Sequence, residues 1–208
     1  MIALIDYSMG NLASVAKALE TVGADVHWVT RPEEAADAAG VVLPGVGNFG
    51  DGMRQLEARG WSGFLREWTA ADRPFLGICL GMQMLFDASA EAPGVAGLGI
   101  VPGTVKKFPP SVGKIPHMGW NAVRVPEHPA RGLAAFAGSA EYFYFVHSFY
   151  VEPADLAWSG GVTGYNGVEF TAAVARGNLV ATQFHPEKSQ NAGLRLLKNF
   201  VEMCGETR

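Results

Sequence analysis

The sequence predicts an α/β protein with an open, mostly parallel twisted sheet flanked by helices, and with an additional antiparallel β region. As far as Phe86, short apolar runs that match buried strands alternate with segments of helical periodicity. This alternation is typical of helices that cover both faces of a parallel sheet. Beyond Phe86 the pattern changes to strand-like runs rich in aromatic and β-branched residues, two of which flank a turn at 176–178. These later runs predict the antiparallel region.

Local signals define the individual elements. A helix over about 12–22 has an apolar face and ends at Gly23, and Pro32 suits the first position of a second helical segment. Further helical segments are expected near 53–68, at 80–86 and around 194–201. The predicted strands are 2–5, 26–29, 41–43, 75–78, 101–108, 122–125, 142–151, 170–175 and 179–184. Two segments, 44–50 and 116–121, are predicted loops.

Composition narrows the class of protein. A length of 208 residues suits one domain over 1–208, and 17 % charged residues with a net charge of −4 give no nucleic-acid footprint. No apolar stretch approaches the length of a membrane span, and the N-terminus lacks the basic region of a signal peptide. Two cysteines do not make a disulfide framework. We therefore expect a cytoplasmic protein.

The strongest chemical signal is the segment 75–83, where an apolar strand ends at Cys79. Gly77 and Gly81 flank the cysteine two residues on either side, and a helical pattern follows. This Gly-x-Cys-x-Gly spacing has the form of a nucleophile elbow, with cysteine in place of serine. The N-terminus of the following helix favours a thiolate and a developing oxyanion. The alternative is a small buried cysteine in an ordinary strand.

A base and an acid for this nucleophile are found at the end of the last predicted strand. His185 can take the proton of the thiol and later give it to a leaving nitrogen, and Glu187 can orient the imidazole. Residues two apart in an extended segment project to the same side, and Pro186 favours that conformation. In a parallel sheet this strand end can lie beside Cys79. A surface or core histidine is the alternative for His185 alone.

Two further features fit the hydrolysis of a small amide. The glycine-rich loop 44–50 can present backbone N–H groups as an oxyanion hole, although a plain tight turn would look the same. Gln83 lies one helical turn after Cys79 and can reach back toward it, unless it is simply a half-exposed helical residue. The histidines are scattered without metal-ligand spacing, and no dinucleotide fingerprint is present. We expect neither a metal nor a cofactor.

At these residues the sequence resembles the class I glutamine amidotransferases, which are glutaminases with a Cys-His-Glu triad and a flavodoxin-like fold. The elbow 77–83 and the triplet 185–187 carry this match. More specific motifs occur in the expected order, at 6–11, 44–49, 116–121, 144–148 and 188–189. They resemble most closely the subunits that supply ammonia to a (βα)₈-barrel cyclase. One position departs from the family pattern, because Ser8 stands where a glycine is usual, and it puts only the local loop shape in doubt.

The resemblance implies a reaction and a set of roles. Cys79 attacks the side-chain amide of glutamine, and His185 activates the water that frees glutamate. The ammonia passes to the cyclase, in a heterodimer that makes imidazole glycerol phosphate and an aminoimidazole carboxamide ribotide. The implied oxyanion-hole and glutamine-binding residues are Val46, Gly47, Leu80, Gln83, His147, Ser148 and Phe149. The implied partner-facing residues are Asn11, Trp120 and Lys188, which would otherwise be ordinary solvated loop residues.

Other functions remain open on the sequence. The chain could be the glutaminase subunit of anthranilate synthase or pyridoxal phosphate synthase, against which the 116–121 and 188–189 motifs argue. A cysteine peptidase and a non-catalytic regulatory subunit are more distant alternatives. If the chain is the cyclase-linked glutaminase, we expect the free subunit to be nearly idle. A peptide carbonyl of 45–47, rather than an N–H, can face Cys79 at rest, and a partner would have to change that.

Overall fold

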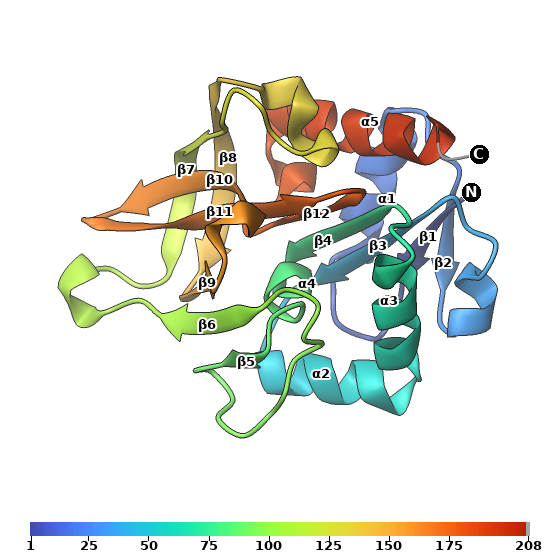
Figure 1. Cartoon of the computed structure of the whole chain (residues 1–208), viewed down its shortest axis with the longest axis horizontal. Helices are drawn as coiled ribbons and strands as arrows, with labels where there is room; N and C mark the ends of the chain where they lie inside the picture. Colours follow the sequence, from blue (N-terminus) through green and yellow to red (C-terminus); the bar gives the residue numbers. More distant parts are fainter. Residues whose placement is uncertain (207–208) are drawn as a thin grey trace.

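The computed structural model describes residues 1–206, and it is built around one twelve-stranded mixed sheet (Figure 1). The main path of the sheet has the order β2-β1-β3-β4-β12-β11-β10-β7-β8. Strands β5, β6 and β9 branch from this path, because β9 pairs with β11 and with β6, and β6 pairs with β5. The predicted fold class, with its parallel part and its antiparallel part, is confirmed.

Five strands form the parallel part. They are β2 (Val26–Val29), β1 (Ile2–Ile5), β3 (Gly40–Gly45), β4 (Phe75–Cys79) and β12 (Leu179–Thr182), in that spatial order. Strands β3 and β12 flank β4 on its two sides, and both run parallel to it. The C-terminal ends of β3, β4 and β12 therefore meet at one edge of the sheet.

The antiparallel part continues from β12. Strand β11 (Val168–Arg176) forms the predicted hairpin with β12, with Arg176 opposite Leu179. The remaining strands are β10 (Ser159–Tyr165), β7 (His117–Arg124), β8 (Ala140–His147), β9 (Phe149–Pro153), β6 (Gly103–Lys107) and β5 (Ala88–Ser89). The pair β7–β8 is in register over all eight residues of each strand.

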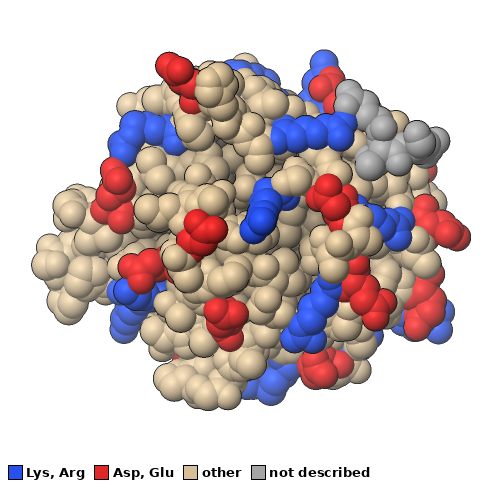
Figure 2. Space-filling model, viewed as in Figure 1, with Lys and Arg blue, Asp and Glu red and all other residues tan. Residues whose placement is uncertain are grey.

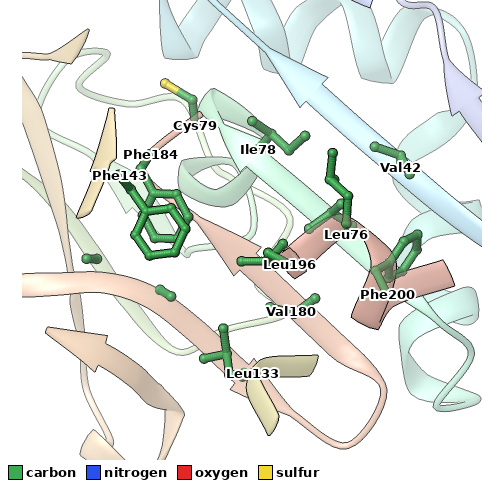
Figure 3. Close-up of a cluster of buried hydrophobic side chains, with 14 of the residues drawn as sticks. Val42, Leu76, Ile78, Cys79, Leu133, Phe143, Val180, Phe184, Leu196 and Phe200 are labelled. Carbon is green, nitrogen blue, oxygen red and sulfur yellow. The ribbon is translucent and has the colours of Figure 1, made fainter. Parts of the chain in front are cut away.

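Helices cover both faces of the parallel part. Helices α1 (Leu12–Thr21) and α5 (Gln190–Glu206) lie on one face, and α2 (Phe49–Ala58) and α3 (Trp61–Ala70) on the other (Figure 1). The strands feed both cores by alternation, since Leu76 packs with the α1/α5 side and Phe75 with the α2/α3 side. Figure 3 shows the first of these clusters, with Cys79 at its edge.

Several sequence predictions differ from the structure. Segment 117–121 is predicted as a loop but belongs to β7. A glycine at position 119, with a φ of 130°, interrupts the strand-like pattern of the sequence there. Strand β10 was not predicted, because three of its seven residues are glycines. A Cβ at Gly160 would lie 2.6 Å from Leu133 Cδ1, so close packing requires glycine there. Ser148 divides the predicted strand 142–151 into β8 and β9.

Other element boundaries moved by a few residues. The predicted helix 80–86 ends early as α4 (Leu80–Gln83), because the carbonyls of residues 84–86 accept hydrogen bonds from the loop at 98–101. Pro44 and Gly45 extend β3 instead of starting the loop. The segment at Pro32 is a short 3₁₀ helix, Pro32–Ala35.

The surface in Figure 2 carries basic and acidic side chains interspersed, without a large region of one sign on the visible face. Within residues 1–206, no helix is both long enough and apolar enough to cross a membrane.

Candidate active site

Cys79 lies on a sharp turn between β4 and α4. Its backbone has φ 54° and ψ −107°, a conformation that L-residues rarely adopt. A Cβ at Gly81 would lie 2.0 Å from the carbonyl oxygen of Leu43, and one at Gly77 would lie 2.9 Å from Ala181 Cβ. Both flanking glycines are therefore required, because neighbouring backbone and side chains come close on each side. This is the strained strand-to-helix geometry of a nucleophile elbow.

His185 and Glu187 follow β12 and reach the same edge of the sheet. His185 Nδ1 and Glu187 Oε1 are 2.8 Å apart, and the two side chains are 3 % and 1 % exposed. The short 3₁₀ helix Pro186–Lys188 places the carboxylate behind the ring. Ser189 fixes the segment, because its hydroxyl donates to the carbonyl of His185 and accepts from the backbone N–H of Tyr144. The backbone of His185, which follows β12, is thus held against β8.

The environment of His185 favours its charged form. Burial by itself would lower the pKa of His185, but hydrogen-bonding and charge interactions with Cys79 and Glu187 outweigh burial and raise that pKa to about 10. Within residues 1–206, Nε2 of His185 has no well-aligned hydrogen-bond partner. This nitrogen is the one that would exchange protons with a reacting group. An imidazolium between a sulfur and a carboxylate is suited to cysteine-based acyl transfer.

A cavity of about 370 Å³ opens above the sulfur. Its lining contains nine of the ten residues that the sequence analysis assigned to the triad, the oxyanion hole and glutamine binding; the tenth, Glu187, lies behind His185. The predicted residues in the lining are Val46, Gly47, Cys79, Leu80, Gln83, His147, Ser148, Phe149 and His185. Sequence reasoning missed Glu91, Pro116 and Val146 in the same lining. Glu91 accepts a 2.7 Å hydrogen bond from the N–H of Phe49, which ties its loop to α2.

The end of β3 forms one wall of this cavity. Gly45 is the register partner of Cys79, and Val46 and Gly47 follow it into the lining. Gly47 has a φ of +101°, which favours glycine. The hydroxyl of Tyr7 lies beneath this wall, since a Cβ at Gly45 would be 2.5 Å from it. Burial raises the pKa of Tyr7 well above its usual range, and its hydroxyl has no hydrogen-bond partner within residues 1–206.

A polar side chain that the sequence analysis did not single out also reaches the sulfur. Gln183 is fully buried, and its Nε2 is 3.7 Å from Cys79 Sγ. Gln83, the residue predicted beside the nucleophile, donates from Nε2 to Gln183 Oε1 at 3.0 Å and to the carbonyl of Phe149 at 3.1 Å. The signal for Gln183 was its position two residues before His185 in an extended segment, which puts both side chains on one side.

The three residues predicted to face a partner are all exposed. Asn11 precedes α1, Trp120 lies on β7, and Lys188 ends the short 3₁₀ helix after His185. The Trp120 ring contacts the ring of Tyr144 edge to face, at 6.2 Å between centroids.

A second, larger cavity of about 610 Å³ lies at the opposite edge of the parallel strands. Its lining includes Arg176 and Leu179 at the β11–β12 turn, and Arg66 and Asp72 from α3 and the segment after it. Neither Cys79 nor His185 contributes to it. Cys79 and His185 thus line the smaller of these two cavities and not the larger.

Comparison with known proteins agrees with this fold and site. A family model described as "Glutamine amidotransferase class-I" matches residues 3–204. A solved glutamine amidotransferase superposes with a TM-score of 0.77 at 18 % identity, over 99 % of this chain and 100 % of that one. The structure of PurLQS from Thermotoga maritima also gives 0.77, at 20 % identity, over 99 % and 97 %. These structures share the fold, and the chain belongs to the class I glutamine amidotransferase family.

Two curated relatives define the subgroup. The imidazole glycerol phosphate synthase subunit HisH of Moorella thermoacetica is 48 % identical over 97 % of this chain and 94 % of its own length. The HisH subunit of Dechloromonas aromatica is 52 % identical over 97 % and 95 %. Within the class I family, the chain belongs with these HisH subunits.

Proposed function

We propose that this chain is the glutaminase subunit of an imidazole glycerol phosphate synthase, acting in histidine biosynthesis as one domain over residues 1–208. In this proposal Cys79, His185 and Glu187 are the catalytic triad. The observation that carries the assignment is the placement of a strained Cys79 and a hydrogen-bonded His185–Glu187 pair at the ends of two adjacent parallel strands, facing one cavity. The relatives at 48–52 % identity favour this subunit over those of anthranilate or pyridoxal phosphate synthase.

The first half of the reaction transfers the glutamyl group to sulfur. The thiolate of Cys79 attacks the amide carbon of glutamine, a C–S bond forms, and the carbonyl electrons move to oxygen. The backbone N–H groups of Val46 and Leu80 receive this oxyanion. His185 gives its proton to the leaving nitrogen, the C–N bond breaks, and ammonia departs. Glu187 binds Nδ1 of His185 and so keeps Nε2, the nitrogen that donates the proton, toward the cavity.

The second half regenerates the enzyme. A water molecule attacks the thioester, and His185, now neutral, takes one of its protons. The C–S bond breaks with its electron pair returning to sulfur, and glutamate leaves. The imidazolium–thiolate pair is then restored. In this scheme Gly47, Gln83, His147, Ser148 and Phe149 hold the substrate, and all five line the cavity.

The ammonia has a defined destination in this proposal. A (βα)₈-barrel cyclase covers the face that carries Asn11, Trp120 and Lys188, and the two chains form a heterodimer. The cyclase uses the ammonia to make imidazole glycerol phosphate and an aminoimidazole carboxamide ribotide. The proposal places the complex in the cytoplasm, where a reducing environment suits the two free cysteines, Cys79 and Cys204.

The test is glutamate release from glutamine in three mixtures: the chain alone, the chain with the cyclase, and both with the cyclase's nucleotide substrate. We expect strong release only in the third mixture. In this proposal a peptide carbonyl of 45–47 faces Cys79 at rest, and only binding of the partner and its ligand favours the conformation in which an N–H faces the oxyanion. High release in all three mixtures would support the glutaminase activity but contradict its dependence on the partner and the ligand. Absence of release in all three mixtures would contradict the proposal that this chain supplies ammonia to the cyclase.

A variant separates the two subunits' chemistry. Cys79→Ala should abolish glutamate release while synthesis from added ammonium salts continues in the complex, since the cyclase needs only ammonia. A Cys79→Ala complex that still released glutamate at the parent rate would exclude Cys79 as the nucleophile.

A further inference from the structure

Gln183 contacts the reacting sulfur but has no role in the triad. It follows the last residue of β12, and its backbone N–H donates to the carbonyl of Ala172 on β11 at 2.8 Å. Its side chain is fully buried and lies between Gln83 and Cys79. Burying a primary amide costs folding free energy unless its N–H and C=O groups form hydrogen bonds.

The direction of the hydrogen bonds around Gln183 is fixed from one end. The carbonyl of Phe149 can only accept, so the side-chain nitrogen of Gln83 must face it, at 3.1 Å. The same nitrogen lies 3.0 Å from the Gln183 side chain, which therefore presents its oxygen. The remaining amide group of Gln183, its NH₂, is then directed to Cys79 Sγ at 3.7 Å. The chain of contacts thus delivers an N–H donor, and not an acceptor, to the sulfur.

The same contacts limit what Gln83 can do. Both hydrogens of its amide nitrogen are used within the protein, by Phe149 and Gln183. Only its oxygen remains for a ligand in the cavity. Gln83 is therefore placed to orient Gln183 as well as to line the site.

We propose that Gln183 is a catalytic residue whose side-chain N–H holds the sulfur of Cys79 in its thiolate form, and that Gln83 is the positioning residue that aims it. The inference rests on the proposed role of Cys79 as the nucleophile. A donor to sulfur stabilises the anion more than the neutral thiol, because a charged acceptor makes the stronger hydrogen bond. Gln183 and His185 then act on the sulfur together, from alternate positions of one extended segment.

Other titratable groups face or surround this sulfur. His185, backed by Glu187, is the cationic partner. Tyr7, from the segment after β1, stays neutral because burial raises its pKa, and His147 on β8 stays neutral because burial lowers its pKa to about 3. Glu91, after β5, lines the same cavity with one carboxylate oxygen bonded to Phe49. Against this background Gln183 supplies a neutral donor whose effect does not vanish when His185 loses its proton.

The experiment measures the rate of Cys79 alkylation by iodoacetamide as a function of pH, in the full-length chain. Mass spectrometry of the Cys79 peptide separates it from Cys204. Gln183→Met keeps the length and removes the donor, and we expect it to move the midpoint of the profile up by about one pH unit, which lowers the alkylation rate about tenfold at pH values well below the midpoint. Gln83→Met leaves Gln183 in place but free to turn, and we expect a smaller shift in the same direction.

Thr182→Val is the matched control. Thr182 is equally buried and adjacent, but its hydroxyl bonds to the carbonyl of Phe184 and not to sulfur. We expect its alkylation profile to match the parent. An unchanged midpoint in Gln183→Met, or an equal shift in Thr182→Val, would overturn the proposal. If Gln183→Met did not fold, an unchanged midpoint in Gln83→Met would do so. Alkylation needs no glutamine, so a chain that fails to release glutamate still gives a decision on Gln183.

Discussion

His117 Nδ1 and His147 Nε2 lie 2.9 Å apart and join β7 to β8, and His147 lines the cavity above Cys79. His147 Nδ1 is 2.8 Å from the carbonyl of Phe149, which can only accept, so Nε2 of His147 must be the acceptor for His117. Burial lowers the pKa of both rings, to about 4 for His117 and about 3 for His147. The pair is therefore neutral, with both tautomers set by one backbone carbonyl.

The first prediction concerns acid stability. An unfolded chain binds protons on these histidines below about pH 6.5, whereas the folded chain does not bind them until about pH 4 or lower. The free energy of unfolding should therefore fall as the pH drops from about 6.5 toward 4. His117→Phe removes one of the two sites, so we expect roughly half of the fall that the pair causes. Urea unfolding at pH 7 and pH 5 measures both slopes.

The same variant has a cost at neutral pH. Phenylalanine keeps the ring that stacks between Phe145 and Tyr165, at 4.8 and 4.2 Å between centroids. It leaves Nε2 of His147 without its donor, which should cost about 1–3 kcal/mol. An unaltered pH slope in His117→Phe would show that another group causes the acid instability.

The second prediction concerns Glu187, the proposed acid of the triad. Glu187→Gln keeps the shape and removes the charge behind His185, so the pKa of the imidazole should fall from its raised value. We expect glutamate release by the complex to drop by roughly two to four orders of magnitude. Synthesis from ammonium salts is the internal control and should be unaffected. Release within threefold of the parent would remove Glu187 from the mechanism.

The third prediction concerns the elbow. In Gly81→Ala the new Cβ would lie 2.0 Å from the carbonyl oxygen of Leu43, so β3 and α4 must separate. We expect a loss of several kcal/mol in the free energy of unfolding together with the loss of Cys79 reactivity. Gly63→Ala is the matched control, because it lies inside α3 with nothing within 4 Å of its Cβ. It should stabilise the protein by about 0.5–1 kcal/mol in the same urea titration. Equal stability of the two variants would contradict the packing argument.

The fourth prediction concerns Ser8, which stands where the family pattern has glycine. Its φ is 70°, a strained value for serine, and its hydroxyl accepts a 2.6 Å hydrogen bond from Arg59. Ser8→Gly and Ser8→Ala both lose this bond, but only glycine relieves the strain. We expect Ser8→Gly to be more stable than Ser8→Ala by about 1 kcal/mol, as read from thermal unfolding of the pair. A more stable alanine variant would mean that the backbone is relaxed at this position.

The sequence predicted the parts of the fold that depend on buried strands and on strand ends. Alternating strands and helices placed Cys79 and His185 at neighbouring strand ends, because parallel strands share one edge. Prediction from the sequence failed for β10, where close packing requires glycines inside the strand. It also failed for β7, where Gly119, with a φ of 130°, interrupts the strand-like pattern of residues.

The candidate site was predicted unevenly for a similar reason. A histidine and a glutamate that flank a proline, such as His185 and Glu187, stand out as a candidate base and acid. Gln183 stands out less, because its position two residues before His185 puts the two side chains on one side of the strand but does not show that its amide reaches Cys79. Glu91 reaches the cavity from a loop whose path depends on contacts with α2.

The backbone register between β4 and β12 has a consequence for how such an enzyme can be controlled. Ile78 pairs with Thr182, one residue before Cys79 and three before His185, so the hydrogen-bonded ladder holds the two ends of these strands together. Separating Cys79 from His185 would require breaking the hydrogen bonds between β4 and β12 in the centre of the sheet. If a partner controls the proposed reaction, its signal is therefore expected to act on the segment after β3, where Val46 is 41 % exposed and Gly47 is a glycine with a φ of +101°. In the proposed mechanism, Cys79 and His185 would then stay together whether or not the partner is bound, and only the segment after β3 would change.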